Sequence, residues 1–177
     1  MAAESIAYPM SISIRLERSD DVAAIGAVNR AAFAGDAEAR LVDALREAGH
    51  VRLSLVAEDA GRVIGHILFS EMWIDAAGGA LDALALAPMA VVPERQRQGV
   101  GTALVRRGLE HCADAGHRIV LVVGHPAYYP RFGFSRESAR RLDSPYQGDA
   151  FMALELAPGA LAGVSGTVRS PPPFANI

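Results

Sequence analysis

The sequence predicts one α/β domain with a mixed, mostly antiparallel sheet of about six or seven strands and about four helices. Residues 53–92 contain three apolar segments separated by two turns, which is typical of an antiparallel meander. Residues 84–115 then read as strand, turn and amphipathic helix, and the apolar strand 118–123 follows. A strand, a helix and a second strand in this order form a right-handed crossover between parallel strands. A further strand near the C-terminus completes the sheet.

The N-terminal part begins without a pattern and then gives one strand and two helices. Residues 1–10 show no periodicity and are expected to form a loose leader. Residues 11–16 alternate apolar with small or polar residues, as a half-buried strand does. Ser19, Asp20 and Asp21 supply helix-start chemistry, and apolar residues then recur at helical spacing up to Phe33. Residues 36–48 read as a second helix, with Gly49 as its stop.

The meander consists of three expected strands, residues 53–58, 62–74 and 81–92. Asp59, Ala60 and Gly61 are suited to the first hairpin turn, and residues 75–79 contain two glycines for the second. The third strand leads directly into the crossover.

After the crossover helix, Gly116 is a natural C-cap for the strand 118–123 that follows. Residues 127–132 are expected to form a short helix, and residues 151–156 form the last clear strand. Glycines and three consecutive prolines indicate that residues 158–177 are an extended tail on the surface. The single domain is therefore expected to span residues 11–157.

Composition restricts the class of protein. With 177 residues and 51% hydrophobic residues, the chain can bury a core without disulfides or metals. The net charge is −3, and the 17 basic residues are spread along the chain, which disfavours a nucleic acid partner. All 17 are arginines, and the absence of lysine excludes Schiff-base catalysis and a Walker-type phosphate loop.

Further absences point to a cytoplasmic protein that does not enter a membrane. Cys112 is the only cysteine, so no intramolecular disulfide can form, which fits a reducing compartment. No apolar run reaches the roughly 18 to 20 residues needed to span a bilayer, and no secretory signal is recognisable. The histidines lack metal-ligand spacing, so we expect no metal.

The turn at residues 96–101 is the strongest functional signal. It joins a buried strand to a helix, and the first N–H groups of a helix attract anions such as phosphates. A dinucleotide-binding fingerprint needs a third glycine where Leu104 stands, and a Walker loop needs lysine where Thr102 stands. Both of these glycine motifs are therefore excluded.

What remains resembles the GNAT family of acetyl-CoA-dependent N-acetyltransferases. Gln96, Gly99 and Gly101 are similar to that family's pyrophosphate-binding motif, Q/R-x-x-G-x-G/A. Residues 129–134 are similar to its Tyr-x-x-x-Gly-Phe motif, at about the expected separation. The order of the expected elements also matches, so the resemblance covers about residues 12–156.

This resemblance implies a fold and a coenzyme site. In the family the strand before the turn bulges and splays from the next parallel strand, and its free backbone groups pair with the pantetheine arm. By position these groups belong to Met89, Ala90 and Val91, with the N–H of Met89 facing the thioester oxygen as an oxyanion donor. Pro88 favours a bulge there, because proline removes a ladder donor. Backbone amides of the turn would bind the coenzyme A pyrophosphate; they belong to Gln96, Arg97, Gln98, Gly99, Val100, Gly101 and Thr102.

For the chemistry, the resemblance makes Tyr129 the general acid near the coenzyme sulfur. A phenol and a thiol have ordinary pKa values close enough for a useful hydrogen bond to the departing thiolate. In the alternative interpretation, Tyr128 and Tyr129 are both packing aromatics beside Phe132 and Phe134.

The general base is left open by the sequence. Some family members place a glutamate on the central strand, eleven residues before the position of Gln96, where this chain has Ala85. The polar candidates nearby are Glu71, Asp82 and His66, acting directly or through water.

The sequence thus predicts an enzyme that transfers acetyl from acetyl-CoA to an amine by direct attack. A coenzyme A-binding regulatory module without turnover is the alternative, as is an acyltransferase that uses a longer acyl group or a non-amine acceptor. No motif identifies the acceptor or shows whether the C-terminal tail contributes to its site. An exposed edge strand and the apolar tail leave a homodimer open.

Overall fold

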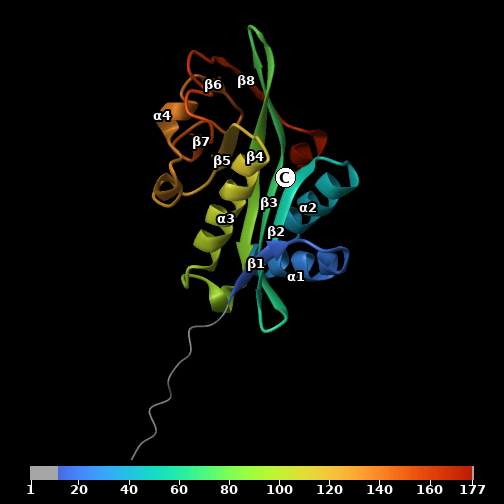
Figure 1. Cartoon of the computed structure of the whole chain (residues 1–177). Coiled ribbons are helices and arrows are strands. Elements are labelled where there is room, and N and C mark those ends of the chain that lie inside the picture. The colour runs from blue at the N-terminus through green and yellow to red at the C-terminus, as the bar shows by residue number, and fades with distance from the viewer. Residues whose placement is uncertain (1–11, 177) are drawn as a thin grey trace, which may run out of the picture.

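The computed structural model describes residues 12–176 and contains an eight-stranded sheet with helices on both faces (Figure 1). The strands are β1 Ser13–Leu16, β2 Val51–Asp59, β3 Arg62–Ala76, β4 Gly79–Val91, β5 Ile119–Val123, β6 Leu142–Asp143, β7 Phe151–Glu155 and β8 Gly166–Arg169. The α-helices are α1 Val22–Phe33, α2 Ala37–Glu47, α3 Val100–Asp114 and α4 Arg136–Ala139. Short 3₁₀ helices are η1 Ser19–Asp21, η2 Pro93–Arg95, η3 Tyr129–Phe132 and η4 Pro172–Asn176.

The main path of the sheet runs β1-β2-β3-β4-β5-β7, with β4 and β5 parallel and the other pairs on this path antiparallel. Helices α1 and α2 lie on one side of the sheet and α3 lies on the other (Figure 1). This arrangement confirms the predicted fold class, a mixed and mostly antiparallel sheet with a central crossover.

The predicted meander is formed by β2, β3 and β4. The turn between β2 and β3 places Ala60 and Gly61 in the left-handed region, with φ of 48° and 78°. Two successive residues with positive φ are what a tight type I′ hairpin requires. β3 and β4 then pair from Ala76 opposite Gly79 to Gly65 opposite Val91, so these two long strands form the centre of the sheet.

Helix α3 packs on this sheet through the apolar stripe that its sequence predicts. Val100, Leu104, Val105 and Cys112 are all buried against one core cluster. Gly108 faces the sheet where the helix approaches most closely, because a Cβ there would lie 2.4 Å from the Phe69 ring. The close approach fixes α3, and with it the turn at its N-terminus, over the centre of the sheet.

The two parallel strands separate soon after they meet. Their pairing is limited to Leu84 opposite Val120 and Ala85 opposite Leu121. On the other side of β4, the register with β3 shifts between Leu86 and Met89, so that Ala87 and Pro88 form a bulge. The predicted splay is therefore present, and it opens a gap between β4 and β5 at the level of the bulge.

The C-terminal segment differs from the surface tail that the sequence suggests. Its residues Gly166–Arg169 form β8, which pairs antiparallel with the end of β3, from Trp73 to Ala76. Phe174 in η4 is buried against the core that α2 helps to form. The pairing of a four-residue strand depends on a partner about 90 residues away, which local sequence patterns do not encode. The expected leader, residues 1–10, lies outside the described residues.

Candidate functional site

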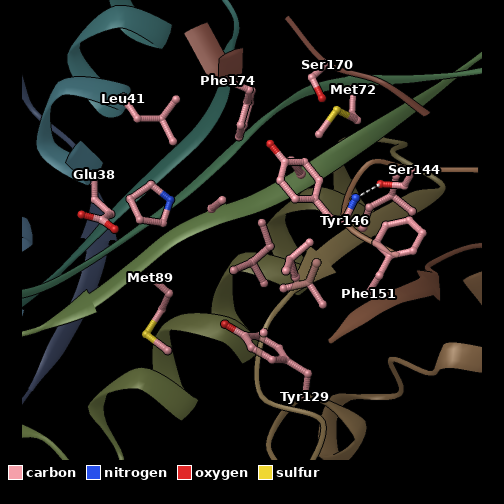
Figure 2. Close-up of a pocket in the computed structure, with 18 of the residues that line it drawn as sticks. Glu38, Leu41, Met72, Met89, Tyr129, Ser144, Tyr146, Phe151, Ser170 and Phe174 are labelled. Atoms are coloured by element: carbon pink, nitrogen blue, oxygen red, sulfur yellow. Dashed lines mark hydrogen bonds between the residues drawn. The ribbon is translucent and has the colours of Figure 1, made fainter. Parts of the chain in front are cut away.

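A cavity of about 620 Å³ opens where β4 and β5 part. Residues 85–89 of β4 and residues 121–124 at the end of β5 form its central walls. Tyr128 and Tyr129 line it after β5, while α1, α2, β3, residues 144–151 and the C-terminal segment contribute the remaining walls (Figure 2). The splay of two parallel strands is thus the structural origin of the cavity.

The N-terminus of α3 provides unused backbone donors. Gly99 is the N-cap, with φ of 86°, and its carbonyl accepts the first helical hydrogen bond from the Ala103 N–H at 3.0 Å. The preceding N–H groups of Val100, Gly101 and Thr102 have no intrahelical acceptor. Together with the helix dipole, these three amides make this end of the helix favourable for a negatively charged group.

The glutamines of the turn hold its shape. The side-chain amide of Gln96 donates to the Val91 carbonyl at 2.8 Å, and its backbone N–H donates to the Pro93 carbonyl at 3.3 Å. The side-chain amide of Gln98 donates to the Glu94 carbonyl at 3.0 Å. Gln96 therefore differs from its expected role, since its N–H is already used within the turn. Arg97, at the exposed corner, has a φ of 59°.

The ladder between β3 and β4 decides which backbone amides face the gap. The Val92 N–H donates to the Ile64 carbonyl at 3.0 Å, so the polar backbone groups of Val92 point toward β3. Orientation alternates along a strand, so those of Ala90 also point toward β3, whereas those of Val91 and Met89 point away from it. Met89 and Val91 thus face the gap as expected, but Ala90 does not, because its groups belong to the ladder.

Met89 also contacts the helix end through its side chain. A Cβ placed on Gly101 would lie 3.1 Å from the Met89 sulfur and 3.5 Å from the Tyr128 hydroxyl. The absence of a side chain at Gly101 therefore keeps the first turn of α3 close to β4. A ligand can reach the helix amides and the β4 backbone at the same time.

Tyr129 lies in the cavity wall with its ring packed and its hydroxyl pointing toward Met89 (Figure 2). The ring makes edge contacts with Tyr128 and Phe134, at centroid distances of 5.1 and 5.7 Å. Burial, followed by the neighbouring Tyr128, raises the pKa of Tyr129 to about 12. Tyr129 is thus held by packing, and its phenol stays protonated at neutral pH.

Tyr128, the other candidate of the pair, is turned toward α3. Its hydroxyl lies 3.1 Å from the Thr102 hydroxyl, and the Arg131 guanidinium covers its ring at 4.3 Å. These contacts join the segment after β5 to the first turn of α3. The two tyrosines therefore have different environments, although both line the cavity.

None of the three expected general bases lines the cavity. Glu71 is bound by Arg52 and by His50, whose Nδ1 is 2.7 Å from its carboxylate. Asp82 is exposed on β4 opposite Trp73. His66 is fully buried, 3.2 Å from the Asn29 side-chain amide and 3.0 Å from the Ser54 hydroxyl. All three residues are predicted as bases because they lie on the central strands. Side chains alternate between the two faces of a strand, so a position on these strands does not by itself put a side chain in the cavity.

The burial of His66 predicts a pH-dependent stability. Desolvation, with a smaller contribution from Arg46, lowers the pKa of His66 from 6.5 to about 3. Between these two pH values the unfolded chain binds a proton at His66 that the folded chain does not. His66 therefore does not lower the free energy of unfolding above pH 6.5, and it lowers that free energy progressively as the pH falls below 6.5. This one group is expected to add up to about 1.4 kcal/mol per pH unit to the slope of the unfolding free energy.

Urea unfolding between pH 5 and 7 tests this expectation. The slope of the unfolding free energy should become smaller in His66→Gln than in the unsubstituted protein. His117→Gln, a change at a half-buried histidine outside the core, is the control and should leave the slope unchanged. An unchanged slope in His66→Gln would show that His66 does not stay neutral in the folded state.

Sequence reasoning missed the cavity residues outside the coenzyme motifs. They come from α2 and from segments after β6 that are far apart in the chain, namely Glu38, Ser144, Tyr146, Phe151, Ser170 and Phe174 (Figure 2). In the sequence, Glu38 looks like an ordinary acidic residue in the first turn of a helix, so no local signal distinguishes it.

Two further structural features are absent from residues 12–176. No group of three His, Cys, Asp or Glu side chains there is arranged to hold a metal ion. No helix in the same range is long and apolar enough to cross a bilayer.

Known proteins share this arrangement of elements. The family model for the acetyltransferase (GNAT) domain matches residues 13–136. The Escherichia coli K12 protein named "uncharacterized N-acetyltransferase YhbS" is 40% identical over 159 residues, which cover 88% of this chain and 94% of YhbS. The crystal structure of YhbS in complex with CoA has a TM-score of 0.87 at 37% identity, covering 97% of this chain and 96% of that one. A GNAT family acetyltransferase from Brucella melitensis in complex with acetyl-CoA has a TM-score of 0.79 at 36% identity, covering 94% and 99%.

Proposed function

This chain belongs to the GNAT family of acetyltransferases, and we propose that it transfers acetyl from acetyl-CoA to an amine by direct attack in a ternary complex. The observation that carries the proposal is the gap between β4 and β5, which joins the anion-binding end of α3 to the cavity that contains Tyr129. The related structures that bind CoA and acetyl-CoA support acetyl-CoA as the donor.

The coenzyme would bind along the edge of β4. Its pyrophosphate meets the N–H groups of Val100, Gly101 and Thr102, where the helix dipole favours negative charge. Its pantetheine arm lies in the gap and pairs with the backbone groups of Met89 and Val91 that point away from β3. This geometry carries the thioester past the first turn of α3 and into the cavity.

Two groups would assist the transfer. The N–H of Met89 donates to the thioester oxygen as negative charge develops on it. Tyr129 donates a hydrogen bond to the sulfur as the C–S bond breaks. A phenol with a pKa of about 12 is a weaker acid than a thiol, whose ordinary pKa is about 8.5, so it stabilises the thiolate chiefly by hydrogen bonding.

A coenzyme A-binding regulatory module is the second candidate. It is favoured by Ala85, which leaves the central strand without a carboxylate at the position where some family members have a glutamate. A cavity that extends well beyond the coenzyme gap, toward α2 and the C-terminal segment, favours turnover instead, because a regulatory site needs no space for an acceptor.

Calorimetric titration of the full chain with acetyl-CoA, followed by thiol-release assays over a panel of amines, tests the proposal. We expect saturable 1:1 binding and release of free CoA thiol that depends on the amine. Absence of binding would overturn both candidates. Binding without thiol release on any amine would favour the regulatory module, and faster release from a longer acyl-CoA would revise the donor.

A further inference from the structure

We infer that the acceptor is a small primary amine with an apolar body, and that Glu38 binds its ammonium group and takes up its proton. This inference rests on the proposed acetyl transfer and names the acceptor class and the base of that site. It comes from one carboxylate and the apolar surface that surrounds it.

Glu38 is the one acidic residue among the described residues that line the cavity. It stands in the first turn of α2 and is half-buried. Neighbouring acids are paired, since Asp36 lies 2.8 Å from Arg30 and Asp43 lies 2.9 Å from Arg46. Within residues 12–176, Glu38 has no such hydrogen bond or ion pair, so its carboxylate is available to a cationic ligand.

The rest of this end of the cavity is mainly apolar. Leu41 follows Glu38 by one helical turn, and Met72, Phe151, Val168 and Phe174 are all buried in the walls. In Figure 2, Glu38 and Met89 lie toward one end of the cavity, and Tyr146, Ser144 and Phe151 lie toward the other. An acceptor held by Glu38 near the reaction centre would therefore extend its body over apolar side chains.

The same lining argues against other acceptor classes. Among the described lining residues no arginine is present, so a carboxylate or phosphate on the acceptor would find only His125 as a basic partner. A polyamine would bring a second ammonium group to a site with one carboxylate. An amino sugar would place several hydroxyl groups against apolar walls, which costs free energy when their hydrogen bonds to water are lost.

The C-terminal segment makes a free small molecule a better fit than a lysine of a folded protein. Val168 of β8 and Phe174 of η4 form walls of the cavity, and Phe174 belongs to the same buried cluster as Leu41 of α2. These two residues therefore line the apolar part of the cavity together with Leu41. The body of the acceptor lies between them, where its apolar surface leaves water.

The protons of the reaction then balance. The amine nitrogen forms a bond to the thioester carbon, and the C–S bond breaks. Of the protons on the ammonium group, Glu38 takes one and later releases it to solvent, and a second one ends on the coenzyme sulfur beside Tyr129. The products are the N-acetylated amine, the free thiol and one proton, without any further reactant.

Steady-state kinetics with Glu38→Gln tests the inference. With 2-phenylethylamine as the probe, we expect kcat/KM to exceed that for spermidine, glucosamine or a lysine peptide by at least about tenfold. Glu38→Gln should raise the KM for 2-phenylethylamine by about 10- to 100-fold and leave the KM for acetyl-CoA within about twofold. Glu47→Gln, on the exposed end of the same helix, is the matched control and should behave like the unsubstituted enzyme.

An uncharged ligand separates charge recognition from a structural effect. The inhibition constant of 2-phenylethanol against the amine should be the same for the unsubstituted enzyme and for Glu38→Gln, because 2-phenylethanol lacks the ammonium group. If Glu38→Gln loses affinity equally for 2-phenylethylamine and 2-phenylethanol, Glu38 only shapes the cavity. A higher kcat/KM for spermidine or the peptide in the unsubstituted enzyme would overturn the apolar acceptor class.

Calorimetry distinguishes failure of this inference from failure of the proposed function. If acetyl-CoA binds but no amine releases thiol, transfer itself is overturned. Titration of 2-phenylethylamine into the CoA complex still tests the recognition step. Weaker binding to Glu38→Gln than to the unsubstituted protein supports it. Equal binding to both proteins, or no binding to the unsubstituted protein, contradicts it.

Discussion

Tyr129→Phe is expected to lower kcat by about 100-fold, the lower end of what a positioned proton or hydrogen-bond donor contributes. The substitution removes the phenol that would stabilise the departing thiolate, and it keeps the ring that packs on Tyr128 and Phe134. The KM for acetyl-CoA and the midpoint of thermal unfolding should therefore stay nearly constant. Steady-state thiol release and a melting curve measure all three quantities.

Tyr128→Phe is the matched control for this experiment. It removes the neighbouring hydroxyl, which lies 3.1 Å from the Thr102 hydroxyl at the first turn of α3, so kcat should change only a few-fold. The reverse order of the two effects would assign the thiolate contact to Tyr128. A collapse of acetyl-CoA affinity in Tyr129→Phe would make Tyr129 a packing residue. With a pKa of about 12, Tyr129 should also cause no fall in rate between pH 7 and pH 10.

Gly101→Leu is expected to weaken acetyl-CoA binding by at least about 100-fold. The new side chain would begin 3.1 Å from the Met89 side chain and occupy the space where the coenzyme passes the helix end. Hydrogen bonds to charged groups contribute about 1.5 to 3 kcal/mol each, so losing one or two of them gives a change of this size. Calorimetric titration measures the dissociation constant directly.

Protein stability should fall less than acetyl-CoA affinity in Gly101→Leu, because the higher helix propensity of leucine offsets part of the cost of crowding Met89. Gly101 does not have a positive φ, and leucine is a far better helix former than glycine. Ala113→Leu, at an exposed position near the other end of α3, is the control and should bind acetyl-CoA normally. Unchanged affinity in Gly101→Leu would place the pyrophosphate elsewhere than at the first turn of α3.

Local patterns were sufficient to predict most of the elements. Residues close in sequence determine three of these features. They are the hairpin at Ala60 and Gly61, the apolar stripe on α3 and the short apolar strand β5. Patterns of this range are visible in the sequence because side-chain spacing reports directly on the period of the backbone. For the same reason β8 was missed, since its four residues are a strand only because the end of β3 is there to pair with them.

The coenzyme side of the site was predicted from adjacent residues, and its details needed the register. Gln96, Gly99 and Gly101 mark the turn in the sequence, but only the ladder with β3 separates Met89 and Val91, which face the gap, from Ala90, which does not. A shift of register by one residue would exchange these orientations. The sequence contains the motif but not the register.

By itself the sequence determined the fold class, the crossover and the anion-binding turn, because each is specified by residues close together in the chain. The tertiary structure alone decided which residues line the rest of the cavity. Glu38 on α2, Phe151 on β7 and Phe174 in η4 come from three distant segments that meet around one cavity. Burial of apolar surface brings these segments together. Because burial is non-directional, no short motif in the sequence indicates which carboxylate will line the cavity.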